Sequence, residues 1–330
     1  MATRRRKTDP RDALEALAAI RAGASTPEGR RALGEALEKG AGVVAAKAAA
    51  IIREQRLEGF EDALRAAFDR FLQDPARTDP SCRAKVAILE ALDFLEWMDP
   101  EPFLRGVRYV QEEKQWGPPV DTATGVRSRS AFALARLRHP DHAMLMAELL
   151  VDREPAVREA AADAIAHRGD PAGAPLLLLK LRTGDPEPPV LLACLQGLLE
   201  LAPATGLAVA DGWLYGEDAG ARELGAIALG ESRREDALER LLEALERSAT
   251  PRERAVLFRA LALHRSEGAL AALLKVVAAG PVADARVVLE ALGPRAEERG
   301  LREQLQNAAS QREESRGLED ALGRFAQQRT

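Results

Sequence analysis

The stretch "DREPAVREAAADAIAHRGDPAGAPLLLLKLRTGD", residues 152–185, decides the fold. Its first half places Val157, Ala161 and Ile165 at helical spacing, and Leu177 and Leu181 mark a second apolar stripe in the other half. Between the stripes stands "HRGDP", where a glycine ends one helix and an Asp-Pro pair begins the next. The stretch therefore predicts two helices joined by a tight turn.

The same two-helix unit recurs along the chain. Val157-Arg158 align with Val126-Arg127, 31 residues earlier, and further copies follow at spacings of about 30 residues. Aromatic residues make up only 4% of the chain, and alanine, leucine, arginine and glutamate dominate, which favours helices over strands. One hairpin alone cannot bury its apolar faces, so the copies are predicted to stack on one another.

The copies also predict how the chain is organised. We expect a disordered basic tail at residues 1–8, a degenerate helical pair or cap at 9–40, a repeat array at 41–306 and a polar cap or tail at 307–330. Inside the array, the insertion "QEEKQWGPPVDTATG", residues 111–125, lengthens the spacing between two copies to about 42 residues.

The repeated pattern resembles a known family. An Asp followed six residues later by the Arg of Val-Arg, as in "DREPAVR" and "DTATGVR", precedes an alanine-rich helix, a "GDP" turn and a leucine-rich helix. This pattern is similar to HEAT repeats of the short bacterial class that is also found in phycobilin lyases. The resemblance spans about four-fifths of the chain and is strongest over residues 121–245. It implies an all-α, right-handed α-solenoid with first helices outside and second helices lining the concave face.

The resemblance further implies a ladder of Asp and Arg side chains between adjacent repeats. Leu191 stands where one of the arginines would be expected, which interrupts the pattern. The members of the expected ladder are Asp121, Arg127, Asp152, Arg158 and Arg222.

Enzymatic chemistry finds little support in the sequence. The HEAT-like enzyme deoxyhypusine hydroxylase binds iron through His-Glu pairs, and none of the four histidines here precedes a Glu. His139 and His142, in "HPDH", are interpreted as a solvated turn, and His167 and His264 as caps at helix ends. We expect no catalytic residue, no metal and no cofactor. An enzyme or chromophore lyase subunit stays as a minor alternative.

The main alternative is a nucleic-acid-binding or DNA-repair HEAT-like protein. Residues 1–56 carry 12 Lys or Arg against 7 Asp or Glu, whereas residues 57–294 carry 28 against 38. An acidic array does not resemble a groove that follows a phosphate backbone, and the chain contains no P-loop sequence. Nucleic acid is therefore not expected as a partner.

Nothing in the sequence predicts contact with a membrane. The apolar run "AGVVAAKAAAII", residues 41–52, contains Lys47 and is too short to cross a bilayer. Cys82 and Cys194 both lie within apolar helical stripes, which predicts buried thiols. We expect a cytoplasmic protein.

Binding of a protein or peptide partner is the function that the sequence favours, with the chain acting as a non-enzymatic scaffold or adaptor through its concave face. Trp116, followed by Gly117-Pro118-Pro119, is either a contact for the partner or a plug that fills a gap between repeats. Trp213 and Tyr215, in "ADGWLYGED", are candidates for a groove or a joint.

The second-helix segment "PEPFLRGVRYVQEE", residues 100–113, supplies the other candidate contacts. Helical spacing predicts that Phe103, Val107 and Val110 are buried. The same spacing leaves three charged residues on the open face: Arg105, Arg108 and Glu112.

Overall fold

The computed structural model describes residues 10–114 and 116–312, together with residues 318, 320, 322, 323 and 325. Nearly all of these residues are helical, and the strands among them are confined to one short hairpin. None of the described helices is both long enough and apolar enough to cross a membrane. The all-α class that the sequence predicts is confirmed.

The helices alternate between first and second members of a pair. Two helices come before the repeats, α1 (Pro10–Ile20) and α2 (Pro27–Lys39). The first helices are α3 (Gly42–Glu54), α6 (Arg83–Phe94), α8 (Thr124–Arg136), α10 (Pro155–Arg168), α12 (Pro188–Leu201), α14 (Ala219–Ser232), α16 (Pro251–His264) and α18 (Val282–Leu292). The second helices are α4 (Glu61–Phe71), α7 (Glu101–Gly106), α9 (His142–Leu149), α11 (Ala174–Thr183), α13 (Pro203–Leu214), α15 (Glu235–Arg247), α17 (Glu267–Ala279) and α19 (Leu301–Ser310).

Short elements fill the connections between these helices. They are α5 (Pro75–Thr78) and four single 3₁₀ turns, η1 (Arg21–Gly23), η2 (Pro80–Cys82), η3 (Pro171–Gly173) and η4 (Gly293–Arg295). The chain divides into two compact units, residues 1–168 and residues 169–330.

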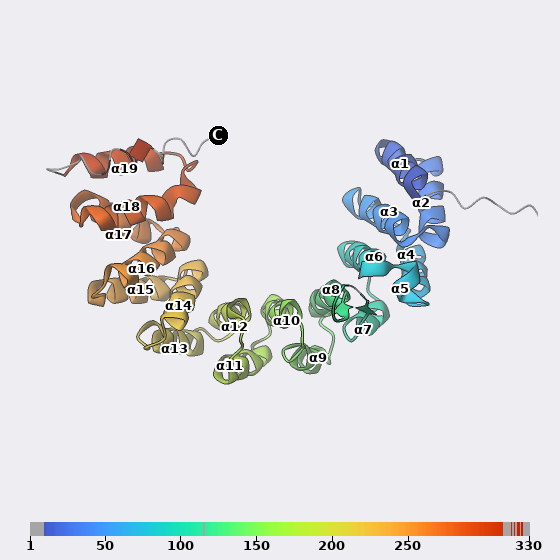
Figure 1. Cartoon of the computed structure of the whole chain (residues 1–330), viewed down its shortest axis with the longest axis horizontal. Coiled ribbons are helices and arrows are strands. Elements are labelled where there is room, and N and C mark those ends of the chain that lie inside the picture. The colour runs from blue at the N-terminus through green and yellow to red at the C-terminus, as the bar shows by residue number, and fades with distance from the viewer. Residues whose placement is uncertain are drawn as a thin grey trace, which may run out of the picture. The chain divides into compact units, whose positions relative to one another are not determined.

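Each unit is built from two layers of helices. In the first unit α3, α6, α8 and α10 lie side by side in one layer, and α4, α7 and α9 form the other (Figure 1). In the second unit α12, α14, α16 and α18 form one layer, and the second helices form the other (Figure 1). Stacked helical hairpins of this kind are an α-solenoid.

The first helices lie on the inner side of the bend within each unit (Figure 1). The expectation that second helices line the concave face is therefore wrong. Small residues explain the arrangement, because a Cβ atom at Gly230 of α14 would lie 2.3 Å from the carbonyl oxygen of Ala260 in α16. Between α3 and α6, Ala45, Ala48 and Ala84 are fully buried. Close approach in the first layer shortens that side of the stack and bends it inward.

The turn in the defining stretch forms as the sequence predicts. Helix α10 ends at Arg168, Gly169 takes a left-handed conformation with φ +68°, and the Asp170 carboxylate accepts a hydrogen bond from the Ala172 N–H at 3.0 Å. The left-handed residue ends the helix without steric cost because glycine has no Cβ. The Asp side chain then starts the next turn.

The insertion forms a small antiparallel hairpin with strands β1 (Glu112–Glu113) and β2 (Val120–Asp121). Glu112 pairs with Asp121 and Glu113 with Val120. Phe103 and Val107 are buried as predicted, but Val110 is 51% exposed. The prediction for Val110 is wrong because α7 ends at Gly106, and helical spacing no longer governs the residues that lead into the hairpin.

The two ends of the chain are described only in part. The expected tail at residues 1–8 lies outside the described residues. Within 307–330, α19 continues to Ser310, and beyond Arg312 only five residues are described. Two of those five, Leu318 and Phe325, are buried.

Candidate functional site

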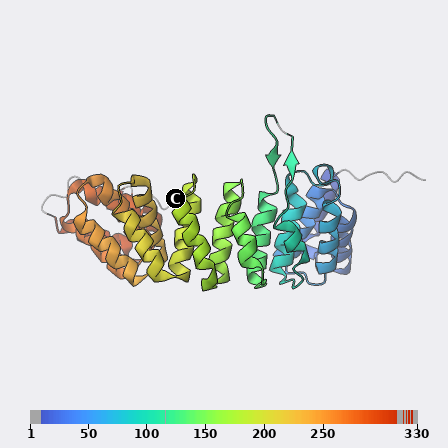
Figure 2. The same ribbon diagram turned by 90° about the horizontal axis from the view of Figure 1, so that it is seen from below.

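The hairpin projects from the connection between α7 and α8, beyond the ends of the helices of its unit (Figure 2). Trp116 lies in the turn between the two strands and is fully exposed. Val120, in the second strand, is 44% exposed. An indole that is wholly open to solvent fills no space between repeats, so the alternative that Trp116 is a plug is wrong.

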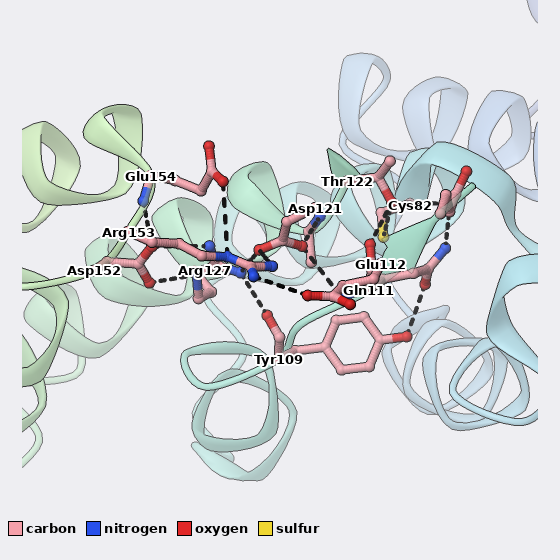
Figure 3. A network of polar contacts seen from close by, with 12 residues as sticks. Cys82, Tyr109, Gln111, Glu112, Asp121, Thr122, Arg127, Asp152, Arg153 and Glu154 are labelled. Atoms are coloured by element: carbon pink, nitrogen blue, oxygen red, sulfur yellow. Dashed lines mark hydrogen bonds and ion pairs between the residues drawn. The ribbon is translucent and has the colours of Figure 1, made fainter. Parts of the chain in front are cut away.

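The base of the hairpin is held by the side chain of Gln111, which is 4% exposed. Its amide nitrogen donates hydrogen bonds to the Asp79 carbonyl oxygen at 3.1 Å and to the Glu113 carboxylate at 2.6 Å. The Thr122 hydroxyl donates to the same Glu113 carboxylate at 2.9 Å. These bonds join the two strands to each other and to the turn before α6 (Figure 3).

Beside Gln111 lies a buried ion network centred on Arg127, in α8 (Figure 3). The Arg127 guanidinium is 2% exposed and pairs with the Asp121 carboxylate at 2.8 Å and with the Asp152 carboxylate at 2.9 Å. It also donates a hydrogen bond to the Tyr109 carbonyl oxygen at 2.8 Å. Asp121 belongs to the hairpin and Asp152 to the turn before the next repeat, so one cation fastens both. The predicted ladder is confirmed at Arg127.

The other arginines of the expected ladder bind the carbonyl oxygens of their own turns. Arg158 donates to the carbonyl oxygens of Asp152 and Arg153, at 2.9 and 3.2 Å. Arg222 donates to those of Gly216 and Glu217, at 2.6 and 2.9 Å. These bonds satisfy the turn that leads into each first helix.

Sequence reasoning missed two further links. Lys85 pairs with Asp79 at 3.0 Å, both side chains being buried, and Arg254 pairs with Asp284 at 2.7 Å. The first pair could have been found, because Asp79 precedes Lys85 by the same six residues that separate Asp121 from Arg127. It was missed because the pattern demanded an arginine.

Two carboxylates of this region, Asp121 and Glu113, are held in the charged form. Burial alone would raise the pKa of Asp121, but N–H donors from Ala123 and Gln111 and the charge of Arg127 outweigh it, so the pKa is lowered. The pKa of Glu113 is lowered in the same way, against its burial, by donors that include the Ser81 N–H.

The Cys82 thiol lies beside the hairpin base, with its sulfur 3.6 Å from the Thr122 hydroxyl. Burial raises the pKa of this thiol to about 11, which keeps it protonated at neutral pH. Both Cys82 and Cys194 are buried, as predicted. Among the described residues, no cluster of His, Cys, Asp and Glu is arranged to hold a metal ion.

The charged second-helix candidates are exposed, but each is paired with a neighbouring element. Arg105 pairs with Asp69 of α4. Arg108 makes two hydrogen bonds to Glu148 of α9, at 2.7 and 2.6 Å. Glu112 pairs with Arg153 at 2.8 Å, which fastens the outside of the hairpin.

Trp213 and Tyr215 belong to the second unit, where α13 ends. Trp213 is half-buried, and its Cβ lies 3.3 Å from the place where a Cβ on Gly225 of α14 would stand. Tyr215 is 44% exposed, and the guanidinium of Arg247 lies over its ring at 4.6 Å from the ring centre.

The histidines serve the packing of the repeats. His139 accepts a hydrogen bond from the Asp141 N–H at 3.2 Å, but His142 is buried, so the interpretation of both as a solvated turn is wrong. Helix α9 begins at His142 and carries that side chain inward. His167 packs edge to face on Phe132. His264 contacts the Ser266 hydroxyl at 2.8 Å and the Arg234 carbonyl oxygen at 2.9 Å.

Two stacked layers of short helical hairpins, linked by buried ion pairs, define an all-α protein of the helical-repeat class. Residues 121–199 match the family model for HEAT repeats. Among solved structures, the chain is similar to the complex of CpcE and CpcF of phycocyanin lyase from Nostoc sp. PCC7120, at 16% identity and a TM-score of 0.33. That similarity covers 94% of this chain and 97% of the other. No curated protein matches the sequence.

Proposed function

We propose that this protein is a non-enzymatic scaffold or adaptor that binds a protein or peptide partner, and that the hairpin of residues 111–122 is a main contact. The observation that carries the proposal is the full exposure of Trp116 on a support whose base is buried and hydrogen-bonded. Tryptophan is among the residues that contribute most to protein interfaces when buried there. An indole left in water therefore favours a contact over a structural role.

The rigidity of the support strengthens the proposal. A mobile loop would lose conformational entropy on binding, which reduces affinity. Here Gln111, Thr122 and Asp121 fix both strands before any partner arrives. Pro118 and Pro119 further restrict the turn that carries Trp116.

The bend of the first unit changes which surface we assign to the partner. Arg105 belongs to a second helix and Arg108 follows it, on the outer side of the bend, where both are paired with other repeats. Exposed pairs of this kind contribute little energy. We therefore assign the main contact to the hairpin rather than to these two arginines.

The test is an affinity isolation from the native cell with three forms of the full chain: wild type, Trp116→Ala and Met98→Ala. Met98 is the matched control, because it is 72% exposed and lies in the turn between α6 and α7, at the other end of these helices from the hairpin. A protein retained by wild type and by Met98→Ala, and lost with Trp116→Ala, supports the proposal. Retention of the same proteins by all three forms contradicts it.

A further inference from the structure

The second unit contains a cavity of about 560 Å³ at the connections between second and first helices. It lies between the turn that joins α13 to α14 and the turn that joins α15 to α16. Its volume falls within the range of sites that bind small ligands or single side chains with their neighbours.

The floor of the cavity is apolar. Leu214, Ala244 and Leu257 line it and are buried, so the cavity reaches into the core of the unit. Tyr215 forms one wall, and its ring is covered on one face by the Arg247 guanidinium. Burial raises the pKa of the Tyr215 hydroxyl, with a further contribution from Glu243, so the phenol stays neutral.

The carboxylates at the cavity are already engaged by the protein. The Glu253 side chain accepts hydrogen bonds from the N–H groups of Ala249 and Thr250, both at 3.1 Å, as part of the capping box of α16. Glu223 lies 3.8 Å from Arg259. Both carboxylates therefore already have a partner within the protein.

The arginines at the cavity have fewer charged partners than the carboxylates have donors. Arg222 and Arg252 both line it. Arg222 binds carbonyl oxygens, and its charge also acts on the Glu253 carboxylate. Arg252 is exposed and forms no ion pair within the described part of the chain. The rim therefore attracts an anion, while the floor attracts an apolar group.

We propose that this cavity binds a short acidic peptide segment of a partner protein. One aromatic or large aliphatic side chain of that segment enters between Tyr215 and Leu257, and a neighbouring carboxylate pairs with Arg252. Charge complementarity favours a carboxylate-bearing peptide, and the aromatic wall favours an apolar anchor. A nucleic-acid strand fits less well, because residues 57–294 are acidic as a whole. This inference goes beyond the proposed function, since the cavity belongs to the other unit from the hairpin.

The test uses a defined probe, the dye-labelled peptide Glu-Glu-Phe-Glu-Glu, titrated with the full chain and followed by fluorescence anisotropy. Two control peptides replace Phe by Ser or every Glu by Lys. Two variants remove the recognising groups, Arg252→Glu and Tyr215→Ala. The matched control is Arg182→Glu, which reverses another exposed arginine of the same unit that does not line the cavity.

We expect saturable binding of the Glu-Phe peptide by wild type and by Arg182→Glu. Arg252→Glu should weaken the affinity by about tenfold or more, because it replaces an attraction with a repulsion. Tyr215→Ala should weaken it by a similar factor, and both control peptides should bind at least about tenfold more weakly. Trp116→Ala should leave the affinity unchanged, which separates this site from the hairpin.

Several results would overturn the inference. They are an absence of binding at millimolar peptide, equal binding of the lysine peptide, and an affinity that Arg252→Glu leaves unchanged. Competition by a single-stranded oligonucleotide would reassign the cavity to nucleic acid, and concentration-dependent dimerisation lost in Arg252→Glu would reassign it to a second copy of the chain. Because Arg252 is exposed, its substitution leaves the fold intact, and thermal unfolding of each variant checks this.

Discussion

At the scale of single residues, Arg127 is a buried cation whose carboxylate partners come from two different connections, the hairpin and the turn before α10. Desolvation makes such a group costly, and its charge is compensated only while both partners stay in place. Arg127 therefore links two adjacent repeats through its ion pairs.

Substitution of Arg127 by Ala should lower the free energy of unfolding of the first unit by about 3–5 kcal/mol, because the buried Asp121 loses its close counter-charge and keeps only Arg153, at 3.4 Å. Urea denaturation followed by far-ultraviolet circular dichroism measures the change. The matched control is Arg108→Ala, which breaks an exposed pair and should cost less than about 1 kcal/mol. An equal loss in free energy of unfolding for the two variants would show that the buried network does not link the repeats.

The same network predicts a dependence of stability on pH. The pKa of Asp121 is lowered in the folded state, so its contribution is fully present above the unfolded pKa of about 3.9 and is lost as the pH falls through the folded pKa. Asp121→Asn should be less stable than wild type at pH 7, and the difference should shrink below about pH 4. Unfolding curves at a series of pH values test this. A difference that stays constant across the acid range would contradict the assignment.

At the scale of elements, the hairpin owes its position to the side chains at its base. Replacement of Thr122 by Val keeps the shape of the side chain but removes its hydrogen bonds to Glu113 and to the Gln111 carbonyl oxygen. We expect faster amide hydrogen exchange over residues 112–121 and weaker binding of the partner that depends on Trp116. Thr183→Val, at the end of α11, removes only bonds to carbonyls of its own helix and serves as control. Unchanged hydrogen exchange in the hairpin would mean that its strands are stable without the hydrogen bonds of Thr122.

The elements also show where prediction from sequence ends. The two helices and the turn of residues 152–185 follow from spacing and caps, and the Arg127 ladder follows from the resemblance. Val110 escaped prediction because spacing cannot tell that α7 stops at Gly106. The insertion could be recognised as a break in the repeat. Its two strands could not be predicted, because only two residues of each strand pair with the other. The exposure of Trp116 depends on those strands and could not be read from the chain.

At the scale of the whole molecule, each repeat of a repeat protein contacts only the repeats next to it, so a local loss of stability mainly affects those neighbours. The effect of Arg127→Ala should therefore be confined to the repeats that Arg127 links. Hydrogen exchange followed by mass spectrometry should show faster exchange in α8 and α10 and no change in α16 and α18. Uniformly faster exchange along the chain would mean that the repeats unfold as one cooperative body.

Which layer of helices lies on the inner side of the bend can be seen only in the folded units. Alanine and glycine mark the contacts between first helices in the sequence, but periodicity cannot say which layer is the more closely spaced. The cavity at Tyr215 and Arg252 was beyond prediction for the same reason, because its walls come from two successive turns.

The charge of the whole chain leads to a prediction about nucleic acid. The chain carries a formal net charge of −5, and the excess of acid lies in the repeats. A labelled DNA duplex should show no shift in mobility with the full chain even at low salt, where phosphate contacts are strongest. A shift that disappears as salt is raised would favour the nucleic-acid alternative over the scaffold.

The most direct test of the central claim is photo-crosslinking from position 116 in the native cell. A crosslinking amino acid replaces Trp116 in one form of the chain and Met98 in the other, since both positions are exposed. We predict a discrete protein adduct from position 116 that is not formed from position 98. Identical products from both positions, or no adduct from position 116, would contradict the claim that the hairpin is where this protein meets its partner.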